Sequence, residues 1–241
     1  MDALYTDIRE RILARGCTRI AIEGNIGVGK TSLARLIVRR LGGRLIEDRV
    51  VDNPFLERFY EDAGAYAFQT QLVFLMNRYK QQMALTQNDL FADMLVFDYV
   101  FARDRIFANV ILSDDELALY ERVAAELEAK VNKPDLAVYL QASAPVLFDR
   151  VQIRGRDFER ALSRDYLDAL NDAFNHYFFN YSSGPLLIVN TDAMDFVNDE
   201  RHFADLLRRI AEPVVNTEFY EPSWESRRRS APKSPCARFS T

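Results

Sequence analysis

Short apolar runs alternate along the chain with longer segments in which apolar residues recur at helical spacing. The apolar runs predict buried strands at 18–22, 44–47, 93–98, 136–140 and 185–189. The periodic segments predict helices, the longest at 32–41, 65–85, 113–130, 164–181 and 203–210. Strands that alternate with helices are typical of a parallel sheet covered by helices on both faces. The pattern therefore predicts an α/β fold with three layers and a five-stranded parallel sheet.

Both ends of the chain depart from this alternation. Residues 2–15 carry apolar side chains at helical spacing, which predicts a short N-terminal helix. From Pro213 onward Pro, Ser and Arg are frequent and apolar periodicity fades, which is typical of a disordered segment. We therefore expect a helix at 1–16, one domain at 17–212 and a disordered tail at 213–241.

The first candidate for chemistry lies between the first predicted strand and the first long helix. The run Gly24-Asn25-Ile26-Gly27-Val28-Gly29-Lys30-Thr31 fits G-x-x-x-x-G-K-[ST], the pattern of the phosphate-binding P-loop. Glycines let backbone N–H groups surround phosphate oxygens, Lys30 can contact the β- and γ-phosphates, and the Thr31 hydroxyl can bind Mg²⁺. The following helix directs its positive end at the anion.

The order of the elements supports this motif. A predicted strand at 18–22 precedes the loop, and an amphipathic helix at 32–41, closed by Gly42-Gly43, follows it. A glycine-rich turn without a ligand is the alternative, and the strand–loop–helix order disfavours it.

Acidic residues follow two of the predicted strands. Glu47 and Asp48 end the second strand, and Asp98 ends the third. Ligands bind at the carboxyl ends of strands in open α/β sheets, where a carboxylate can orient a phosphate-accepting hydroxyl or hold Mg²⁺. Neighbouring strand residues face opposite ways, so only one of Glu47 and Asp48 can easily face inward. A solvated acidic turn and a plain strand-end cap are the alternatives.

Two further groups of polar residues are candidates for substrate binding. Gln71 and Arg78 are seven residues apart on one predicted helix and share a face, which suits contact with a nucleobase edge. On the residues alone, a solvated face is the preferred explanation. Arg150 and Arg154 are one helical turn apart, and Arg156 follows a glycine. Cations beside a flexible joint suit a mobile lid that clamps phosphate, rather than a solvated charged face.

Composition limits the class of protein. The net charge of −5 and a pI near 5.2 argue against nucleic acid as the main partner. The two cysteines, Cys17 and Cys236, have no metal-binding spacing and suggest a reducing compartment. No apolar run approaches the length that spans a membrane. We therefore expect a soluble cytoplasmic protein without a membrane partner.

Taken together, these separated motifs resemble the deoxynucleoside kinase family, over about residues 17–212. The bacterial deoxyadenosine/deoxyguanosine kinases are the most similar branch, through Asp52-Asn53-Pro54-Phe55-Leu56 and Tyr66-Ala67-Phe68. The resemblance implies ATP as phosphate donor, Mg²⁺, a deoxynucleoside as acceptor and a homodimer. The apolar side of the predicted helix 113–130 is a candidate face for the second subunit.

The resemblance also implies a role for each matched position. The P-loop would hold the donor triphosphate, Asp48 or Glu47 would be the base, and Thr31 and Asp98 would hold the metal. Lys30 and the lid arginines would be catalytic. The matches to the substrate-binding positions are Tyr60, Gln71, Arg78, Asp104 and Glu159, and those to the lid arginines are Arg150, Arg154 and Arg156.

Two positions depart from the family pattern. The family usually has Glu/Asp-Arg-Ser after the third strand, whereas this chain has Asp98-Tyr99-Val100. The arginine that braces base and phosphate is thus absent, and Arg103 and Arg105 are the candidates to replace it. The second departure is an Asp at position 48, which is one methylene shorter than the usual glutamate.

These matches predict ATP-dependent 5′-phosphorylation of deoxynucleosides in nucleotide salvage. The resemblance to the bacterial branch favours deoxyadenosine and deoxyguanosine, and deoxycytidine is a further candidate substrate. A nucleoside monophosphate kinase such as thymidylate kinase is one alternative, although its acceptor needs basic residues where this chain has an acidic stretch. A nucleotide-binding subunit without catalytic activity is the other. The absent arginine favours that alternative, and the retained Lys30, Thr31 and Asp98 disfavour it.

Overall fold

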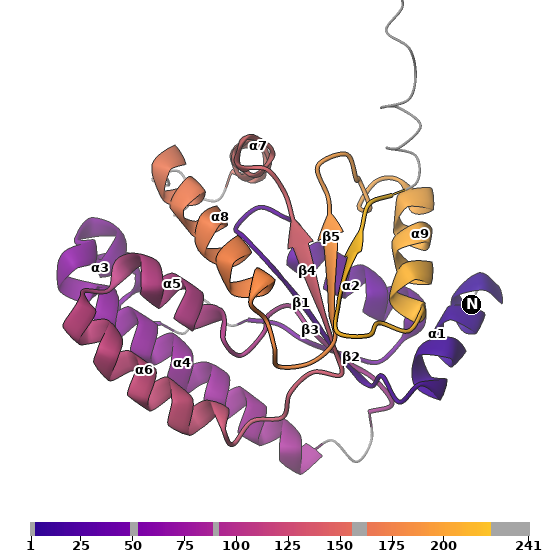
Figure 1. The fold of residues 1–241 in the computed structure, drawn as a ribbon, viewed down its shortest axis with the longest axis horizontal. Coiled ribbons are helices and arrows are strands. Elements are labelled where there is room, and N and C mark those ends of the chain that lie inside the picture. Colours follow the sequence, from indigo (N-terminus) through magenta and orange to yellow (C-terminus); the bar gives the residue numbers. More distant parts are fainter. Residues whose placement is uncertain (1–2, 49–52, 89–91, 156–162, 223–241) are drawn as a thin grey trace, which may run out of the picture.

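A central sheet with helices on both faces forms the body of the molecule (Figure 1). The computed structural model describes residues 3–48, 53–88, 92–155 and 163–222. Within these ranges the strands are β1 (Arg19–Gly24), β2 (Arg44–Ile46), β3 (Leu95–Phe97), β4 (Leu136–Gln141), β5 (Leu186–Asn190) and β6 (Thr217–Tyr220). The helices are α1 (Ala3–Ala14), α2 (Lys30–Leu41), α3 (Leu56–Glu61), α4 (Ala63–Asn88), α5 (Arg103–Ile111), α6 (Asp114–Glu128), α7 (Ala144–Arg154), α8 (Arg164–Phe179) and α9 (Glu200–Ala211).

The strands pair in the order β2-β3-β1-β4-β5-β6, and every pairing is parallel. This confirms the predicted α/β fold, but the predicted count of five strands is wrong. The additional strand is β6, which lies within the segment 213–241 that was expected to be a disordered tail. The ordered part of the chain therefore continues past 212, to residue 222 at least.

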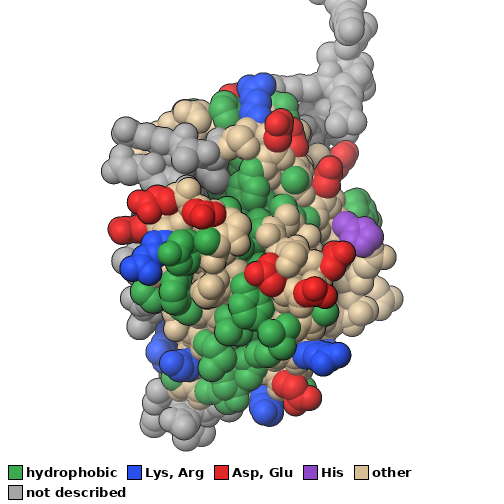
Figure 2. All heavy atoms as spheres, turned by 90° about the vertical axis from the view of Figure 1, so that its left-hand side faces the viewer, with side chains coloured by type: hydrophobic (Ala, Val, Ile, Leu, Met, Phe, Trp, Pro, Cys, Tyr) green, Lys and Arg blue, Asp and Glu red, His purple; other side chains and the backbone are tan. Residues whose placement is uncertain are grey.

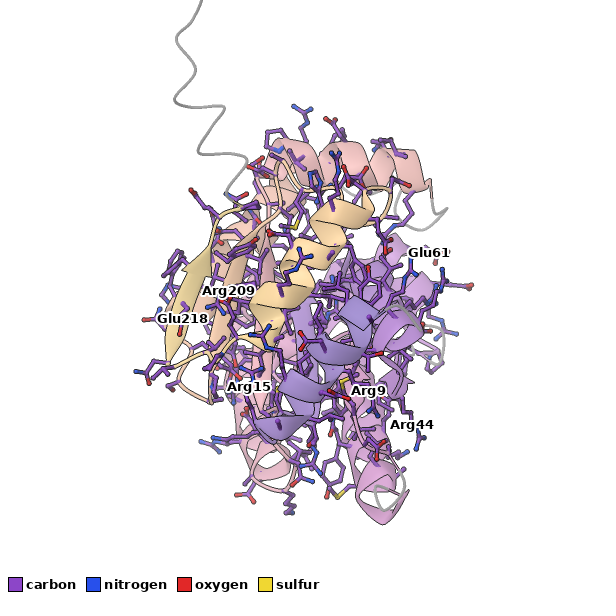
Figure 3. The ribbon with its side chains drawn as sticks, turned by 90° about the vertical axis from the view of Figure 1, so that its right-hand side faces the viewer. Arg9, Arg15, Arg44, Glu61, Arg209 and Glu218 are labelled. Atoms are coloured by element: carbon purple, nitrogen blue, oxygen red, sulfur yellow. The ribbon has the colours of Figure 1, made fainter. Side chains whose placement is uncertain are left out.

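The apolar pattern of the sequence does not reveal β6 because this strand is only slightly buried. Its four residues bury little side-chain surface, so it has no apolar run. Polar contacts with α9 hold it instead: Arg209 pairs with Glu218, and the Tyr220 hydroxyl donates to Asp205. Figure 3 shows Arg209 and Glu218 side by side, one on α9 and one on β6.

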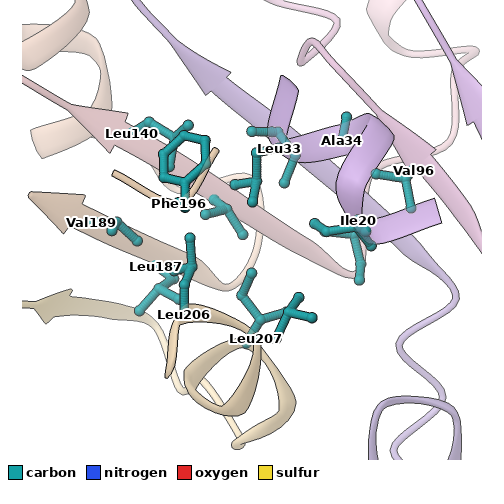
Figure 4. Packing of buried hydrophobic residues seen from close by; sticks show 14 of the residues in the cluster. Ile20, Leu33, Ala34, Val96, Leu140, Leu187, Val189, Phe196, Leu206 and Leu207 are labelled. Carbon is teal, nitrogen blue, oxygen red and sulfur yellow. The ribbon is translucent and has the colours of Figure 1, made fainter. Parts of the chain in front are cut away.

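Alternate residues of the central strands enter two separate cores. Ile20 and Ile22 of β1, with Val138 of β4, pack under α1, α2 and α9. Ala21 and Tyr139, one residue out of phase, pack on the other side against α5 and α8. This is the period of two expected for a strand buried on both faces. Figure 4 shows the first core, where Leu206 and Leu207 of α9 lie against the sheet.

A third, smaller cluster joins α4, α5 and α6 outside these two layers. Its buried members are Leu75, Ala108, Tyr120 and Ala124. A capping box of Ser113 and Glu116 starts α6, at the residue where the sequence predicts the helix 113–130 to begin. Together α4, α5 and α6 form an outer group of helices on one side of the sheet, at the lower left of Figure 1. Among the described residues, no helix is long and apolar enough to cross a membrane.

Candidate active site

The P-loop runs from the end of β1 into the first turn of α2. Gly29 precedes α2 with φ 105°, in the left-handed region. A Cβ atom at Gly29 would also lie 2.8 Å from the ring of Phe196. Both the backbone angle and the close ring therefore require glycine at this position. Because α2 begins at Lys30, its N-terminal N–H groups lie where the motif places a phosphate.

Lys30 is buried at the base of this loop. Its ammonium donates to the carbonyl oxygens of Gly24, at 2.8 Å, and Asn25, at 2.9 Å. Burial, together with the nearby charge of Arg103, lowers the pKa of Lys30 to about 7. A bound triphosphate would supply the negative charge that this buried cation lacks.

Thr31 and Asp98 form the candidate metal pair. The Thr31 hydroxyl donates to Oδ2 of Asp98 at 2.7 Å, and Oδ1 of Asp98 accepts the Asp48 N–H at 2.8 Å. A hydroxyl beside a carboxylate fits Mg²⁺, which takes its other ligands from phosphates and water. The described residues contain no cluster of three or more His, Cys, Asp or Glu side chains suited to a metal ion.

The structure separates the two acids after β2. Glu47 is partly exposed and pairs with Arg35 of α2 at 2.5 Å. Asp48 faces the opposite way, where its Oδ2 accepts from Arg78 at 2.8 Å and from Arg103 at 3.3 Å. Burial acts to raise the pKa of Asp48, but the charges of Arg78 and Arg103 outweigh it and leave the pKa below its usual value. Asp48 is therefore an ionised carboxylate inside the site.

Gln71, Arg78 and Asp104 are all buried, and Arg78 of α4 meets Asp104 of α5. Each is no more than 4% exposed, so the explanation of a solvated face for Gln71 and Arg78 is wrong. Arg78 forms an ion pair with Asp104 at 2.5 Å and lies over the ring of Tyr99 at 4.9 Å. Burial raises the pKa of Asp104 to about 6 despite the charge of Arg78. Oε1 of Gln71 is buried without a hydrogen-bond partner among the described residues.

The two arginines that could replace the absent one occupy different places. Arg103 extends to Asp48 and to the carbonyl oxygen of Asp98, both at 3.3 Å. Arg105 turns away and pairs with Glu121 and Glu128 of α6. The ring of Tyr99 is buried beneath Arg78, and its hydroxyl donates to Gln81 at 2.5 Å.

The predicted lid is described only in part. Arg150 donates to the carbonyl oxygen of Thr191 at 2.7 Å and to that of Val28 at 3.4 Å, so it joins the P-loop to the segment after β5. Arg154 ends α7, and its charge contributes to the lowered pKa of Lys30. Arg156 and Glu159 lie outside the described residues, as does the side chain of Tyr60 in α3.

One buried acid in the site was not predicted. Glu23 of β1 is fully buried, and its carboxylate accepts the N–H groups of Gly24, at 3.0 Å, and Val100, at 2.8 Å. The Nε atom of Arg103 lies 3.6 Å from it. The signal in the sequence is a charged residue within an apolar strand, because a buried acid must have partners.

The fold and the site together define a class. A P-loop opens α2, a hydroxyl–carboxylate pair lies beside it, and a second carboxylate, Asp48, pairs with the buried Arg78 at the same edge of the sheet. These are the parts of a P-loop enzyme that transfers a phosphoryl group to a small acceptor.

The chain belongs to the deoxynucleoside kinase family, whose model matches residues 20–216. It is 32% identical over 201 residues to "Deoxyguanosine kinase" of Bacillus subtilis, covering 81% of this chain and 97% of the relative. It is 26% identical over 204 residues to "Deoxyadenosine/deoxycytidine kinase" of the same organism, covering 81% and 92%. These findings confirm the prediction of a kinase that phosphorylates nucleosides.

The fold agrees with a solved structure of this family. The structure of deoxyadenosine kinase from M. mycoides with bound dATP superposes with a TM-score of 0.70 at 24% identity, covering 81% of this chain and all of that one. The likeness supports the P-loop kinase fold with its parallel sheet.

Proposed function

We propose that this enzyme transfers the γ-phosphoryl group of ATP to the 5′-hydroxyl of purine deoxynucleosides. The observation that carries the proposal is Asp98, whose carboxylate binds both Thr31 of the P-loop and the backbone of Asp48. One side chain thereby joins the donor-binding loop to the carboxylate that would orient the acceptor. Such positioning is the main contribution of a protein to phosphoryl transfer.

In the proposed reaction, residues of the site accept the proton and stabilise the charge that develops during phosphoryl transfer. The 5′-oxygen forms a bond to the γ-phosphorus while Asp48 accepts the hydroxyl proton. The bond from the γ-phosphorus to the bridging oxygen breaks, and its electron pair remains on the ADP product. Lys30 and Arg154 would stabilise the charge that develops on the moving group. Thr31 and Asp98 would hold Mg²⁺, which neutralises phosphate charge when bound.

The polar groups beside Asp48 suit a nucleobase that carries both an amino and an oxo group or ring nitrogen. Arg78 offers a donor fork, while Asp104 and Oε1 of Gln71, which has no hydrogen-bond partner among the described residues, offer acceptors. Guanine, adenine and cytosine edges all complement this set, so the preference for purines rests on the similarity to relatives. The similarity to a deoxyguanosine kinase supports this preference.

We further propose roles for the remaining matched residues. Tyr60 and Glu159 would contact the sugar, and Arg156 would join Arg154 on the phosphate. Arg150 would hold the P-loop against the segment after β5, in keeping with its contacts to Val28 and Thr191. We place the enzyme in cytoplasmic nucleotide salvage, for which the free, buried thiol of Cys17 suits a reducing compartment.

We propose a homodimer formed through α4 and α6. Met76 and Leu119 are exposed apolar residues on these helices. Figure 2 shows apolar side chains gathered on the side of the molecule that α4 and α6 carry. A contiguous apolar surface of this kind is typical of a protein interface.

The decisive experiment measures transfer from MgATP to each of the four deoxynucleosides and, separately, to deoxythymidine monophosphate. The wild-type protein is compared with Lys30→Ala. We expect 5′-monophosphates of deoxyguanosine and deoxyadenosine, and no transfer by Lys30→Ala. Transfer only to the monophosphate would support a thymidylate kinase activity instead. ATP binding without any transfer would support a catalytically inactive subunit.

A further inference from the structure

The guanidinium of Arg103 lies among three anionic or carbonyl groups of the site. Arg103 is the first residue of α5, and its side chain is 11% exposed. Nη1 lies 3.3 Å from Oδ2 of Asp48 and 3.3 Å from the carbonyl oxygen of Asp98. Nε lies 3.6 Å from Oε1 of Glu23. The group therefore sits between the end of β1 and the proposed base.

Arg103 is also linked to the phosphate-binding loop. Its Nη1 contacts the carbonyl oxygen of Asp98, and the carboxylate of Asp98 accepts from the Thr31 hydroxyl of the P-loop. Arg103 therefore lies between the donor-binding loop and Asp48, which suits contact with a phosphate group that passes from donor to acceptor.

Glu23 determines which nitrogen atoms of the Arg103 guanidinium can contact other groups of the site. Its two carboxylate oxygens accept the backbone N–H groups of Gly24 and Val100, so the carboxylate is held in place on both sides. Glu23 faces Nε of the guanidinium, and Nη1 is directed at Asp48. An arginine whose one edge is anchored presents a preorganised fork to a phosphate.

We propose that Arg103 is the cation that binds the transferring phosphoryl group on the acceptor side and orients Asp48, and that Glu23 positions it. The inference rests on the proposed function. It assigns to Arg103 of α5 the role of the arginine that is absent after β3. Position 99 there holds a tyrosine whose buried ring contacts Arg78. Arg103 would donate to the phosphoryl oxygens while the 5′-hydroxyl proton passes to Asp48.

Arg105 provides a matched control. It lies two residues further on the same helix, and its contacts are with Glu121 and Glu128 of α6. Arg103→Ala and Arg105→Ala therefore remove the same group from the same element, one inside the site and one outside it. Thermal unfolding and MgATP binding of both variants report whether each one is folded.

The experiment measures kcat and KM for deoxyguanosine, with and without added guanidinium chloride at millimolar concentration. The wild-type protein must show transfer first, which tests the proposed function separately. For Arg103→Ala we expect kcat to fall about 10²–10³-fold with a smaller change in KM, and to recover in part with guanidinium ion.

Two outcomes would overturn the inference. A kcat of Arg103→Ala equal to that of Arg105→Ala would show that the charge on Arg103 is not used. A loss of kcat that guanidinium ion does not restore, accompanied by a lower unfolding temperature and weaker MgATP binding, would show that Arg103 only supports the fold.

Discussion

The neighbouring acidic residues Glu47 and Asp48 have different surroundings in this structure. Glu47 pairs with Arg35 on the surface, whereas Asp48 lies between two arginines in the interior. The alternation of a strand predicts that one of them faces inward. Which one does so depends on Arg78 and Arg103, which come from distant helices and which no local pattern connects to Asp48.

This difference predicts the result of a matched pair of substitutions. Asp48→Asn should lower kcat by about 10²–10⁴-fold, because an amide cannot accept the hydroxyl proton. Glu47→Gln should leave kcat nearly unchanged, since it removes only a surface ion pair. Steady-state kinetics of both variants checks this. The reverse ranking would make Glu47 the base and contradict the geometry.

A second prediction at this scale concerns protons. In the folded, ligand-free protein the pKa of Lys30 is about 7, so at pH 8 its amine is mostly neutral. A bound triphosphate favours the charged form and raises this pKa, so donor binding at pH 8 should take up nearly one proton. Calorimetry in two buffers with different ionisation enthalpies measures the uptake. It should be smaller in Lys30→Met and should decrease below pH 7.

At the scale of elements, β6 is what the sequence pattern did not predict. It pairs with β5 in parallel through four residue pairs, from Leu186↔Thr217 to Val189↔Tyr220. Its burial is slight, so its stability comes from backbone hydrogen bonds and from polar contacts with α9. The other strands are more buried, and their apolar runs made them predictable to within a few residues.

Truncation tests the contribution of β6. A chain that ends after Asn216 lacks the strand, whereas one that ends after Pro222 keeps it. We expect the shorter chain to lose about 2–4 kcal/mol of unfolding free energy, seen as an unfolding temperature roughly 5–10 °C lower. Differential scanning calorimetry measures both. Equal unfolding temperatures would show that β6 adds nothing to the stability of the sheet.

At the scale of the whole molecule, the helices outside the sheet contribute to two surfaces, the proposed acceptor site and a candidate subunit interface. On α4 the side chains of Gln71 and Arg78 are buried beside the proposed acceptor site, whereas Met76 on the same helix is exposed. The apolar stripe predicted for this helix is therefore only partly buried, because buried polar residues occupy much of its inward face. One helix thus serves the site on one side and a candidate subunit interface on the other.

This arrangement predicts how charge on the outer face affects assembly. Light scattering of the wild-type protein should give twice the 27.8 kDa mass of the chain. Leu119→Asp should give a monomer, because a buried, unpaired carboxylate opposes association. Val197→Asp, at a comparably exposed residue before α9, should remain a dimer. A monomeric wild-type protein would contradict the proposed homodimer.

The sequence by itself determined the features that depend on neighbours along the chain. The P-loop, its flanking strand and helix, and the Ser113 cap are local, and so are the apolar periods that define the α/β fold. The tertiary structure decided which charged groups meet: Asp48 with Arg78 and Arg103, and Glu23 with Val100. Periodicity reports burial along one element, whereas these contacts depend on how elements distant in the chain pack at one edge of the sheet.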